Sequence, residues 1–205
     1  MRELPAGEAV TLSVETQGWA HITAGTAAFK VPCLPAEEYP ALPPVGEGDF
    51  AAIDFDILEE MIRHTTFATS NDETRYTLSG VLVVSDGEDM TMVATDGHRL
   101  AHVKREVSLG KELRVIIPRK ALEEVNRFAS DSDNKEISLA PLENHLVFRH
   151  GQATLVTRLI EGQFPDYEGV IPKDFSRRAL VEHDRLLRAL RRVSLLSNEK
   201  TRPVK

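Results

Sequence analysis

The sequence has very little cysteine and no long hydrophobic run. Cys33 is the only cysteine among 205 residues, which excludes a disulfide within one chain and a zinc site built from several cysteines. So little cysteine is compatible with a reducing cytoplasm. No apolar run approaches the roughly 18 residues of a membrane-spanning helix, and the first residues lack the apolar core of a signal peptide. We therefore expect a globular cytoplasmic protein without membrane contact.

Positive charge is also in deficit. The chain has 25 Lys and Arg against 32 Asp and Glu, for a net charge of −7. Tight binding of nucleic acid depends on Lys and Arg that displace counterions from phosphates, so the total charge argues against it. The distribution of charge can override the total, however, and individual helix faces matter more. Hydrophobic residues make up 41% of the chain, enough for a real core.

Catalytic motifs are missing as well. The sequence has no Gly-rich phosphate loop, no nucleophile elbow and no paired catalytic carboxylates. Asp96 and His98 could share a metal or act as an acid–base pair, but no second ligand cluster accompanies them. A local turn, with Gly97 supplying an unusual backbone angle and Asp96 bonding to its neighbours, explains the same residues. A metal-dependent hydrolase built on Asp96 and His98 is thus a remote alternative.

Apolar periodicity predicts the secondary structure. Alternation indicates strands at 9–15, 18–23 and 26–31, before a Pro- and Gly-rich linker at 40–48. Helical spacing indicates helices at about 54–65, from Pro118 to about 128, and from Asp184 to about Leu196. Further strands are expected at about 75–84, 90–95, 113–117, 135–140, 145–149 and 153–159. This order predicts an α+β fold with antiparallel sheets and paired helices on one face.

Comparison of the sequence with itself indicates a repeat. Leu34–Pro40 resembles Leu159–Pro165 at an offset of 125, since both run Leu, four residues, aromatic, Pro. Ser70–Arg75 resembles Ser197–Arg202 at an offset of 127. In front of these segments, Leu58 and Ile62 fall opposite Leu186 and Leu190. We expect the tail of one repeat at 1–45, a complete domain at 46–172 and the head of a third repeat at 173–205.

One hexapeptide carries a family resemblance. Thr95-Asp96-Gly97-His98-Arg99-Leu100 resembles the signature of bacterial sliding clamps, the β subunits of DNA polymerase III. Supporting matches run along the chain, among them Thr74-Arg75-Tyr76, Ile117-Pro118-Arg119-Lys120 and Gly162–Tyr167. The resemblance implies the DNA-clamp fold with repeated domains, in a head-to-tail homodimer of three-domain chains around duplex DNA. It implies a processivity factor without catalysis or cofactor. It also implies a fragment that lacks the first half of domain one and most of domain three.

The resemblance further implies a cleft that accepts short peptides from DNA polymerase III, the clamp loader and repair proteins. In this sequence the matching positions are Leu78, Thr95, Gly97, His98, Arg99, Leu100, Pro165 and Val170. Apolar walls, polar side chains with long stems and a glycine that admits a peptide backbone suit such a cleft. Most of the second half of the cleft comes from the end of domain three in the family.

Three helices are expected to face DNA. At about 100° per residue, the third predicted helix has an apolar face and a separate face of arginines. In the family, the corresponding helices line the central hole and contact DNA without reading its sequence. The implied DNA-facing residues are Arg63, His64, Arg119, Lys120, Arg127, Arg185, Arg188 and Arg192. A solvated charged face is the ordinary alternative for any such helix.

The resemblance places Phe29, Leu195 and Leu196 at the junction between two chains of the ring. Because both flanking domains are expected to be partial, we expect the central domain to fold stably and the flanks to be less protected or covered by another chain. Such a chain is not expected to close a ring alone. The alternative function is a standalone peptide-binding adaptor that forms no ring.

Overall fold

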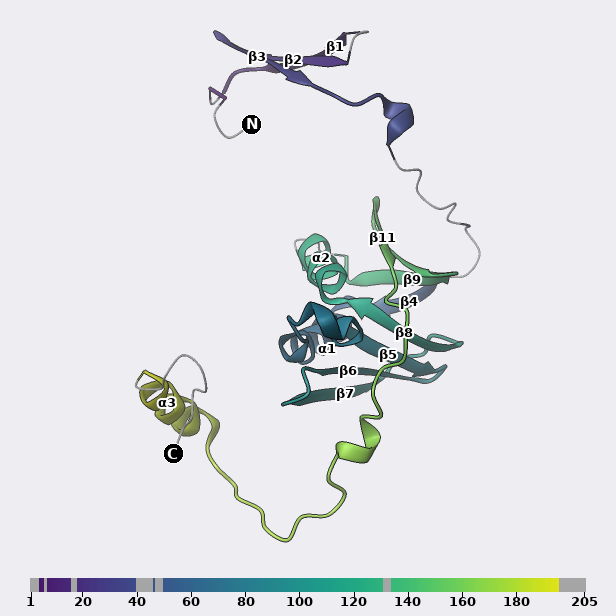
Figure 1. The fold of residues 1–205 in the computed structure, drawn as a ribbon, viewed down its shortest axis with the longest axis vertical. Coiled ribbons are helices and arrows are strands. Elements are labelled where there is room, and N and C mark those ends of the chain that lie inside the picture. Colours follow the sequence, from purple (N-terminus) through teal and green to yellow (C-terminus); the bar gives the residue numbers. More distant parts are fainter. Residues whose placement is uncertain are drawn as a thin grey trace. The chain divides into compact units, whose positions relative to one another are not determined.

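The computed structural model describes residues 4–5, 7–15, 18–39, 46, 50–130 and 134–195. The chain divides into two compact units, Met1–Glu161 and Gly162–Lys205. Each unit is described by itself below, with the elements labelled as in Figure 1. No helix of these residues has the length and apolar character needed to cross a membrane.

The N-terminal segment of the first unit forms a three-stranded antiparallel sheet. Its strands β1 (Val10–Glu15), β2 (Trp19–Ala24) and β3 (Ala27–Pro32) are joined in the order β1-β2-β3 (Figure 1). These strands agree with the predicted ones to within about a residue at each end. The register brings all the apolar alternate positions onto one face of the sheet: Val10, Leu12 and Val14 in β1, Ala20, Ile22 and Ala24 in β2, and Ala27, Phe29 and Val31 in β3. A short 3₁₀ helix, η1 (Ala36–Glu38), follows.

Residues 50–161 contain two four-stranded antiparallel sheets (Figure 1). One sheet has the order β11-β10-β9-β4, formed by Ala153–Arg158, His145–His150, Glu136–Leu142 and Ala51–Asp54. The other has the order β7-β6-β5-β8, formed by Leu100–Glu106, Asp89–Thr95, Gly80–Asp86 and Glu112–Pro118. Their inner faces share one apolar core, which includes Val83, Met92, Ile117, Leu139 and Phe148.

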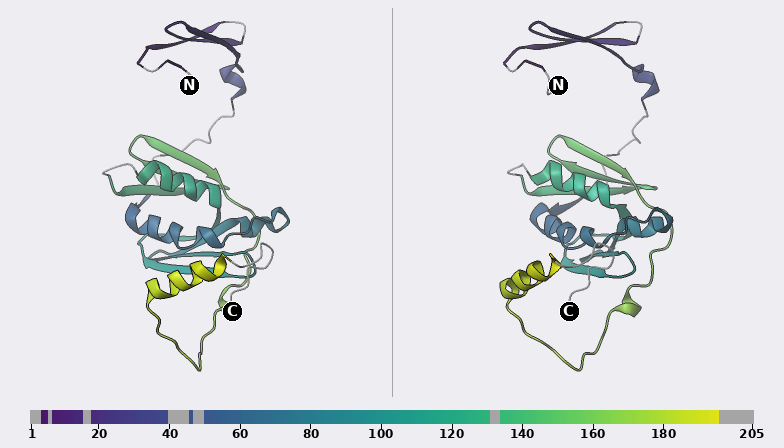
Figure 2. Two further views of the ribbon diagram at one scale, coloured as in Figure 1. Left: turned by 90° about the vertical axis from the view of Figure 1, so that its left-hand side faces the viewer. Right: turned by 60° about the vertical axis from the view of Figure 1, so that its left-hand side comes forward.

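Two helices, α1 (Phe55–Arg63) and α2 (Arg119–Ser130), pack on this core and lie side by side (Figure 2). Helix α1 begins at Asp54, whose carboxylate accepts hydrogen bonds from the Asp56 and Ile57 backbone N–H groups at 2.8 and 3.4 Å. Each helix buries an apolar stripe, made of Phe55, Leu58, Met61 and Ile62 in α1 and of Ala121, Leu122, Val125 and Ala129 in α2. The predicted α+β class with antiparallel sheets and paired helices is confirmed.

The structure corrects one predicted strand and adds two others. The strand predicted at about 75–84 begins only at Gly80, because residues Glu73–Ser79 form 3₁₀ turns, η3. Asp72 caps these turns by accepting hydrogen bonds from the backbone N–H and the hydroxyl of Thr74, at 3.0 and 2.7 Å. Strands β4 and β7 were not predicted: β4 is only four residues long, and β7 is rich in charged residues on an edge of its sheet.

The strands repeat along the chain. Strand β2 and strand β10 lie 126 residues apart and have the same length, and so do β3 and β11. The glycine of each intervening turn adopts a positive φ, +55° at Gly25 and +57° at Gly151. The N-terminal sheet therefore has the same strand order and spacing as β9–β11, as the predicted repeat requires. The division into three domains at 45 and 172 stays a prediction.

The second unit has two regular elements in its described part, the 3₁₀ turn η4 (Glu168–Val170) and helix α3 (His183–Ser194). The helix predicted from Asp184 is thus present, and it ends within the described residues. Glu182 precedes α3 without forming a side-chain capping hydrogen bond, and no residue of the helix is buried.

Candidate peptide-binding turn and DNA-facing helices

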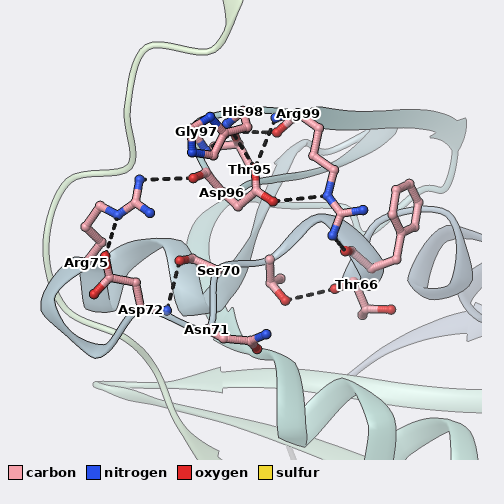
Figure 3. A network of polar contacts seen from close by, with 12 residues as sticks. Thr66, Ser70, Asn71, Asp72, Arg75, Thr95, Asp96, Gly97, His98 and Arg99 are labelled. Atoms are coloured by element: carbon pink, nitrogen blue, oxygen red, sulfur yellow. Dashed lines mark hydrogen bonds and ion pairs between the residues drawn. The ribbon is translucent and has the colours of Figure 1, made fainter. Parts of the chain in front are cut away.

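The hexapeptide singled out in the sequence forms the tight turn between β6 and β7. Thr95 and Leu100 are cross-strand partners at the two ends of the turn. Gly97 has a φ of +88°, a backbone conformation that side chains disfavour. The Thr95 hydroxyl accepts from the Gly97 N–H at 3.1 Å and donates to the Arg99 carbonyl at 2.7 Å (Figure 3). The turn thus closes on itself through its own side chains.

Asp96 stabilises the turn from inside. One carboxylate oxygen accepts from the backbone N–H groups of His98 and Arg99, at 2.9 and 3.0 Å, and the other accepts from the Arg99 Nε at 3.1 Å. The His98 N–H first, and then that of Arg99, lower the pKa of Asp96 below its ordinary value. Asp96 therefore has the local structural role that the sequence left open. Among the described residues, no group of three or more His, Cys, Asp and Glu side chains is placed to hold a metal.

Arg99 anchors the turn to the segment that follows α1. Its Nη2 donates to the Phe67 carbonyl at 2.7 Å, and its guanidinium lies 5.6 Å from the centre of the Phe67 ring (Figure 3). Phe67 belongs to the 3₁₀ turn η2 (Thr66–Ala68) and is itself exposed. The aromatic ring and the cation together form an exposed amphipathic surface beside the turn.

Arg75 is a residue that the sequence did not assign to the site. Its Nη1 donates to the Asp96 carbonyl at 3.0 Å, and its Nε donates to the Asp72 carboxylate at 3.0 Å (Figure 3). Thr74-Arg75-Tyr76 was part of the family resemblance, but a pairing between residues 75 and 96 is not visible in the order of the residues. Only the fold brings η3 beside the β6–β7 turn.

The structure distributes the eight predicted cleft residues unevenly. Thr95, Gly97, His98, Arg99 and Leu100 come together in the turn, with Gly97, His98 and Arg99 exposed. Leu78 is buried at the end of η3, so its side chain belongs to the packed interior more than to an open wall. Pro165 and Val170 are exposed residues of the second unit, and their membership of one cleft with the turn stays a prediction.

Two surface hollows flank η3. One, of about 450 Å³, is lined by the segment before η3, by η3 itself, and by the end of β8 with the start of α2: Ser70, Asn71, Asp72, Tyr76, Ser79, Pro118, Arg119 and Lys120. The other, of about 320 Å³, is lined by Tyr76, Ser79 and residues 158–161. Tyr76 and Ser79 border both hollows, and Tyr76 is largely exposed. This part of the surface therefore combines an aromatic ring and hydroxyls with three cations, Arg119, Lys120 and Arg158, and two carboxylates, Asp72 and Glu161.

The predicted DNA-facing residues of α1 and α2 are not a purely basic surface. Arg63, His64, Lys120 and Arg127 are exposed and Arg119 is half-buried. Several have acidic partners on the same helix: Arg119 with Glu123 and Arg127 with Glu124, both at 3.0 Å, and His64 with Glu60 at 3.7 Å. The prediction considered the cations and left out the glutamates, which neutralise much of the charge on these helices.

Helix α3 is different, because Arg185, Arg188, Arg191 and Arg192 are all exposed. Its only acidic residue is Asp184, whose carboxylate Oδ1 lies 3.0 Å from the Nδ1 of His183. Within the described residues, none of the four arginines forms an ion pair. Leu186 and Leu190 on the apolar face are exposed as well. Helix α3 therefore presents the most basic surface of the three helices.

Two of the three predicted junction residues are described. Phe29 lies on β3, an edge strand of the N-terminal sheet, and is about half exposed. Leu195 follows α3 and is strongly exposed. Leu196 lies outside the described residues. Their place at a junction between two chains stays a prediction.

Comparison with known proteins identifies the family. The protein-family model described as "DNA polymerase III beta subunit, central domain" matches residues 52–166. A beta sliding clamp from Staphylococcus epidermidis is 35% identical, over 97% of this chain and 52% of that protein. One from Synechocystis is 34% identical, over 96% of this chain and 55% of that protein. The chain thus spans about half the length of the curated relatives that it matches.

Solved structures agree with the sequence matches. The Bacillus subtilis DNA polymerase sliding clamp superposes with a TM-score of 0.86 and 33% identity, over 97% of this chain and 52% of that one. A Bartonella birtlesii sliding clamp bound to griselimycin superposes with a TM-score of 0.85 and 33% identity, over 97% and 55%. The predicted DNA-clamp fold is confirmed. The chain belongs to the DNA polymerase III beta subunit family, the bacterial sliding clamps.

Proposed function

We propose that the chain serves as part of a DNA polymerase processivity factor, a clamp that encircles duplex DNA and docks other replication proteins. The observation that carries this proposal is the β6–β7 turn, whose hydrogen bonds hold Gly97, His98 and Arg99 exposed on a protein of the sliding-clamp family. The role is mechanical, takes place in the cytoplasm and requires no cofactor, because no covalent bond is made or broken.

Docking uses short peptides of DNA polymerase III, the clamp loader and repair proteins. The proposed peptide site comprises Leu78, Thr95, Gly97, His98, Arg99 and Leu100 in the first unit, and the family resemblance adds Pro165 and Val170 as a further prediction. The exposed Gly97 backbone and the Arg99–Phe67 pair offer polar and apolar contacts to an extended peptide. We expect weak binding, in the high micromolar range, because so small a contact area offsets little of the entropy lost on association.

An NMR titration tests the docking role. A peptide containing Gln followed by spaced Leu and Phe is added to the whole chain, and shifts are expected at residues 95–100. Griselimycin, which is bound in the Bartonella clamp structure, serves as a competitor of the peptide. Peptide-induced shifts that cluster away from this turn, or shifts that are absent at saturation, would reject the proposed site.

Contact with DNA is proposed for basic residues on or next to α1, α2 and α3, all exposed except the half-buried Arg119: Arg63, His64, Arg119, Lys120, Arg127, Arg185, Arg188 and Arg192. The glutamates beside several of them make strong phosphate binding unfavourable, which suits a protein that slides. Weak contact with phosphates carries no sequence information. The proposed homodimer joins Phe29 of one chain to Leu195 and Leu196 of its partner in the ring.

A second candidate function is a standalone peptide-binding adaptor that forms no ring. It is favoured by one observation: the turn and both arginines that hold it lie within residues 66–100, inside the first compact unit. Light scattering and retention on DNA separate the two candidates. A dimer that stays on circular DNA and leaves linearised DNA supports the ring, whereas a monomer that binds the peptide and ignores DNA supports the adaptor.

A further inference from the structure

Arg75 joins two segments that the sequence keeps apart. Its Nε and Nη1 bond to Asp72 on one side and to the Asp96 carbonyl on the other, both at 3.0 Å. Asp72 is itself fixed, because it also accepts two hydrogen bonds from Thr74. Figure 3 shows the guanidinium bridging between η3 and the β6–β7 turn. Arg75 is thus held at one end while it holds the turn at the other.

The hydrogen bonds of the turn fall into two classes. Those of Thr95 and Asp96 to residues 97–99 lie within the turn and fix its internal shape. Within the described residues, the side-chain hydrogen bonds that tie the turn to other segments come from Arg75 and Arg99. Arg99 ties it to η2, and Arg75 ties it to η3. Removal of Arg75 would therefore leave the turn folded and change its placement against η3.

Gly97 supplies independent support for this role. A Cβ atom added at Gly97 would lie 2.9 Å from the Arg75 Nη1, closer than real Cβ atoms come to other heavy atoms, so the arginine tip would have to shift. The space beside Gly97 is therefore occupied by the Arg75 guanidinium. The positive φ of the turn is what favours glycine here, and the absence of a Cβ atom also lets the Arg75 guanidinium lie against the turn without shifting.

We propose that Arg75 is a positioning residue of the peptide site, supported by Asp72, which sets the placement of the 95–99 turn relative to η3. The proposal rests on the proposed docking function, because η3 presents the exposed Tyr76 beside the buried Leu78, and the turn presents Gly97, His98 and Arg99. A peptide that spans both segments binds well only when they keep a fixed separation. Because Arg75 is 44% exposed, the expected effect of its loss on affinity is moderate, about three- to tenfold.

The test compares Arg75→Ala, Arg75→Lys and Asp72→Asn with Lys104→Ala in the whole chain. Lys104 is a matched control, because it pairs with Asp89 at 2.6 Å, has a similar exposure of 53% and lies outside the turn. Two quantities are measured: peptide affinity, and hydrogen exchange of the His98 and Arg99 amides that bond to Asp96. A positioning role predicts weaker peptide binding in Arg75→Ala with both amides still protected, and no change in Lys104→Ala.

Lysine separates positioning from simple charge attraction, since it keeps the charge but cannot bridge Asp72 and the Asp96 carbonyl as a planar guanidinium does. Arg75→Lys is therefore expected to bind the peptide as weakly as Arg75→Ala does. The peptide affinity of Asp72→Asn is expected to lie between that of Arg75→Ala and that of the wild type. Wild-type affinity in Arg75→Ala, full rescue by lysine, or loss of amide protection would each overturn the proposal. If the wild-type chain binds no peptide, the docking function fails. The positioning role is then judged by whether Arg75→Ala moves the backbone shifts of residues 95–99 while both amides stay protected.

Discussion

Helices α1 and α3 occupy equivalent places in the predicted repeat, yet they differ in nearly every interaction. Helix α1 has a capping hydrogen bond from Asp54, four buried residues and an ion pair from Glu60 to Arg105 on β7 at 2.6 Å. Helix α3 has no side-chain cap and no buried residue. From the sequence, α1 has a formal charge of −2 and α3 of +3. Isolated helices of 9 and 12 residues are marginal in water, so α1 owes its stability to packing, whereas no residue of α3 is buried in the part of the chain that the structure describes.

The test with the largest expected effect truncates one apolar side chain in each helix. Met61→Ala in α1 is expected to cost about 2–5 kcal/mol of unfolding free energy, because Met61 is fully buried and its loss leaves a cavity. Leu186→Ala in α3 should cost less than about 1 kcal/mol, since Leu186 is 46% exposed. Urea denaturation followed by circular dichroism measures both. Equal losses would mean that α3 is packed as firmly as α1.

The second test concerns charge. Replacing Arg185, Arg188 and Arg192 of α3 together with Ser should lower the salt dependence of DNA binding by up to about three counterions. Replacing Arg119 and Arg127 of α2, which pair with Glu123 and Glu124, should change it less. Fluorescence anisotropy at several salt concentrations gives the slopes. Tight binding with a clear sequence preference would contradict a sliding role for either helix.

The third test removes the N-terminal cap of α1 and introduces one at α3. Asp54→Ala removes the hydrogen bonds to the Asp56 and Ile57 N–H groups and should destabilise the central domain by about 1 kcal/mol. Glu182→Ala should have little effect, because Glu182 forms no capping hydrogen bond, whereas Glu182→Ser should raise the helicity of α3. Denaturation and far-ultraviolet circular dichroism measure these changes. A large loss in Glu182→Ala would show an interaction at the start of α3 that capping does not explain.

The smallest expected effect is a pH dependence. The hydrogen bond from Arg105 lowers the pKa of Glu60 below its ordinary value of 4.5. A carboxyl group whose pKa is lowered by folding stabilises the protein above its unfolded pKa, and this contribution disappears as the pH falls through the folded pKa. Arg105→Ala should therefore lower the melting temperature slightly at pH 7 and leave it unchanged well below pH 4.5. The same deficit at both pH values would point to lost packing of the arginine stem instead.

The sequence predicted most of the framework because periodicity is a local property. The alternation in residues 9–15 and the apolar spacing of Leu58, Met61 and Ile62 identified elements that the structure contains. Strand β7 was missed because Lys104, Arg105 and Glu106 mask its alternation on a sheet edge. The η3 turns were taken for a strand because their stabilisation by Asp72 depends on side-chain hydrogen bonds and not on apolar spacing.

The candidate site was predicted in part. The turn at 95–100 could be located because its residues are consecutive and Gly97 has few roles other than a special backbone angle. Arg75 could not be found in this way, since its partner Asp96 is 21 residues away. Nor could the sequence show that Leu78 is buried, because an apolar residue at the end of η3 fits a core or a cleft equally well. Long-range pairings of this kind follow from the fold alone.

The matching hairpins of the chain have a consequence for how it folds. Strands β2 and β3 have the same lengths and the same turn geometry as β10 and β11, and β1 is the counterpart of β9, the native neighbour of β4. Chains fold from the N-terminus as they are synthesised, so β1–β3 exist before β9 emerges. We predict that the edge of β4 can then pair with β1, which also alternates apolar and polar residues, before β9 is available. In this hypothesis β1 and β9 compete for β4 during folding, and the native pairing is fixed when Ile137 and Leu139 of β9 enter the core. The yield of refolding, more than the final stability, is the property that the repeat places at risk.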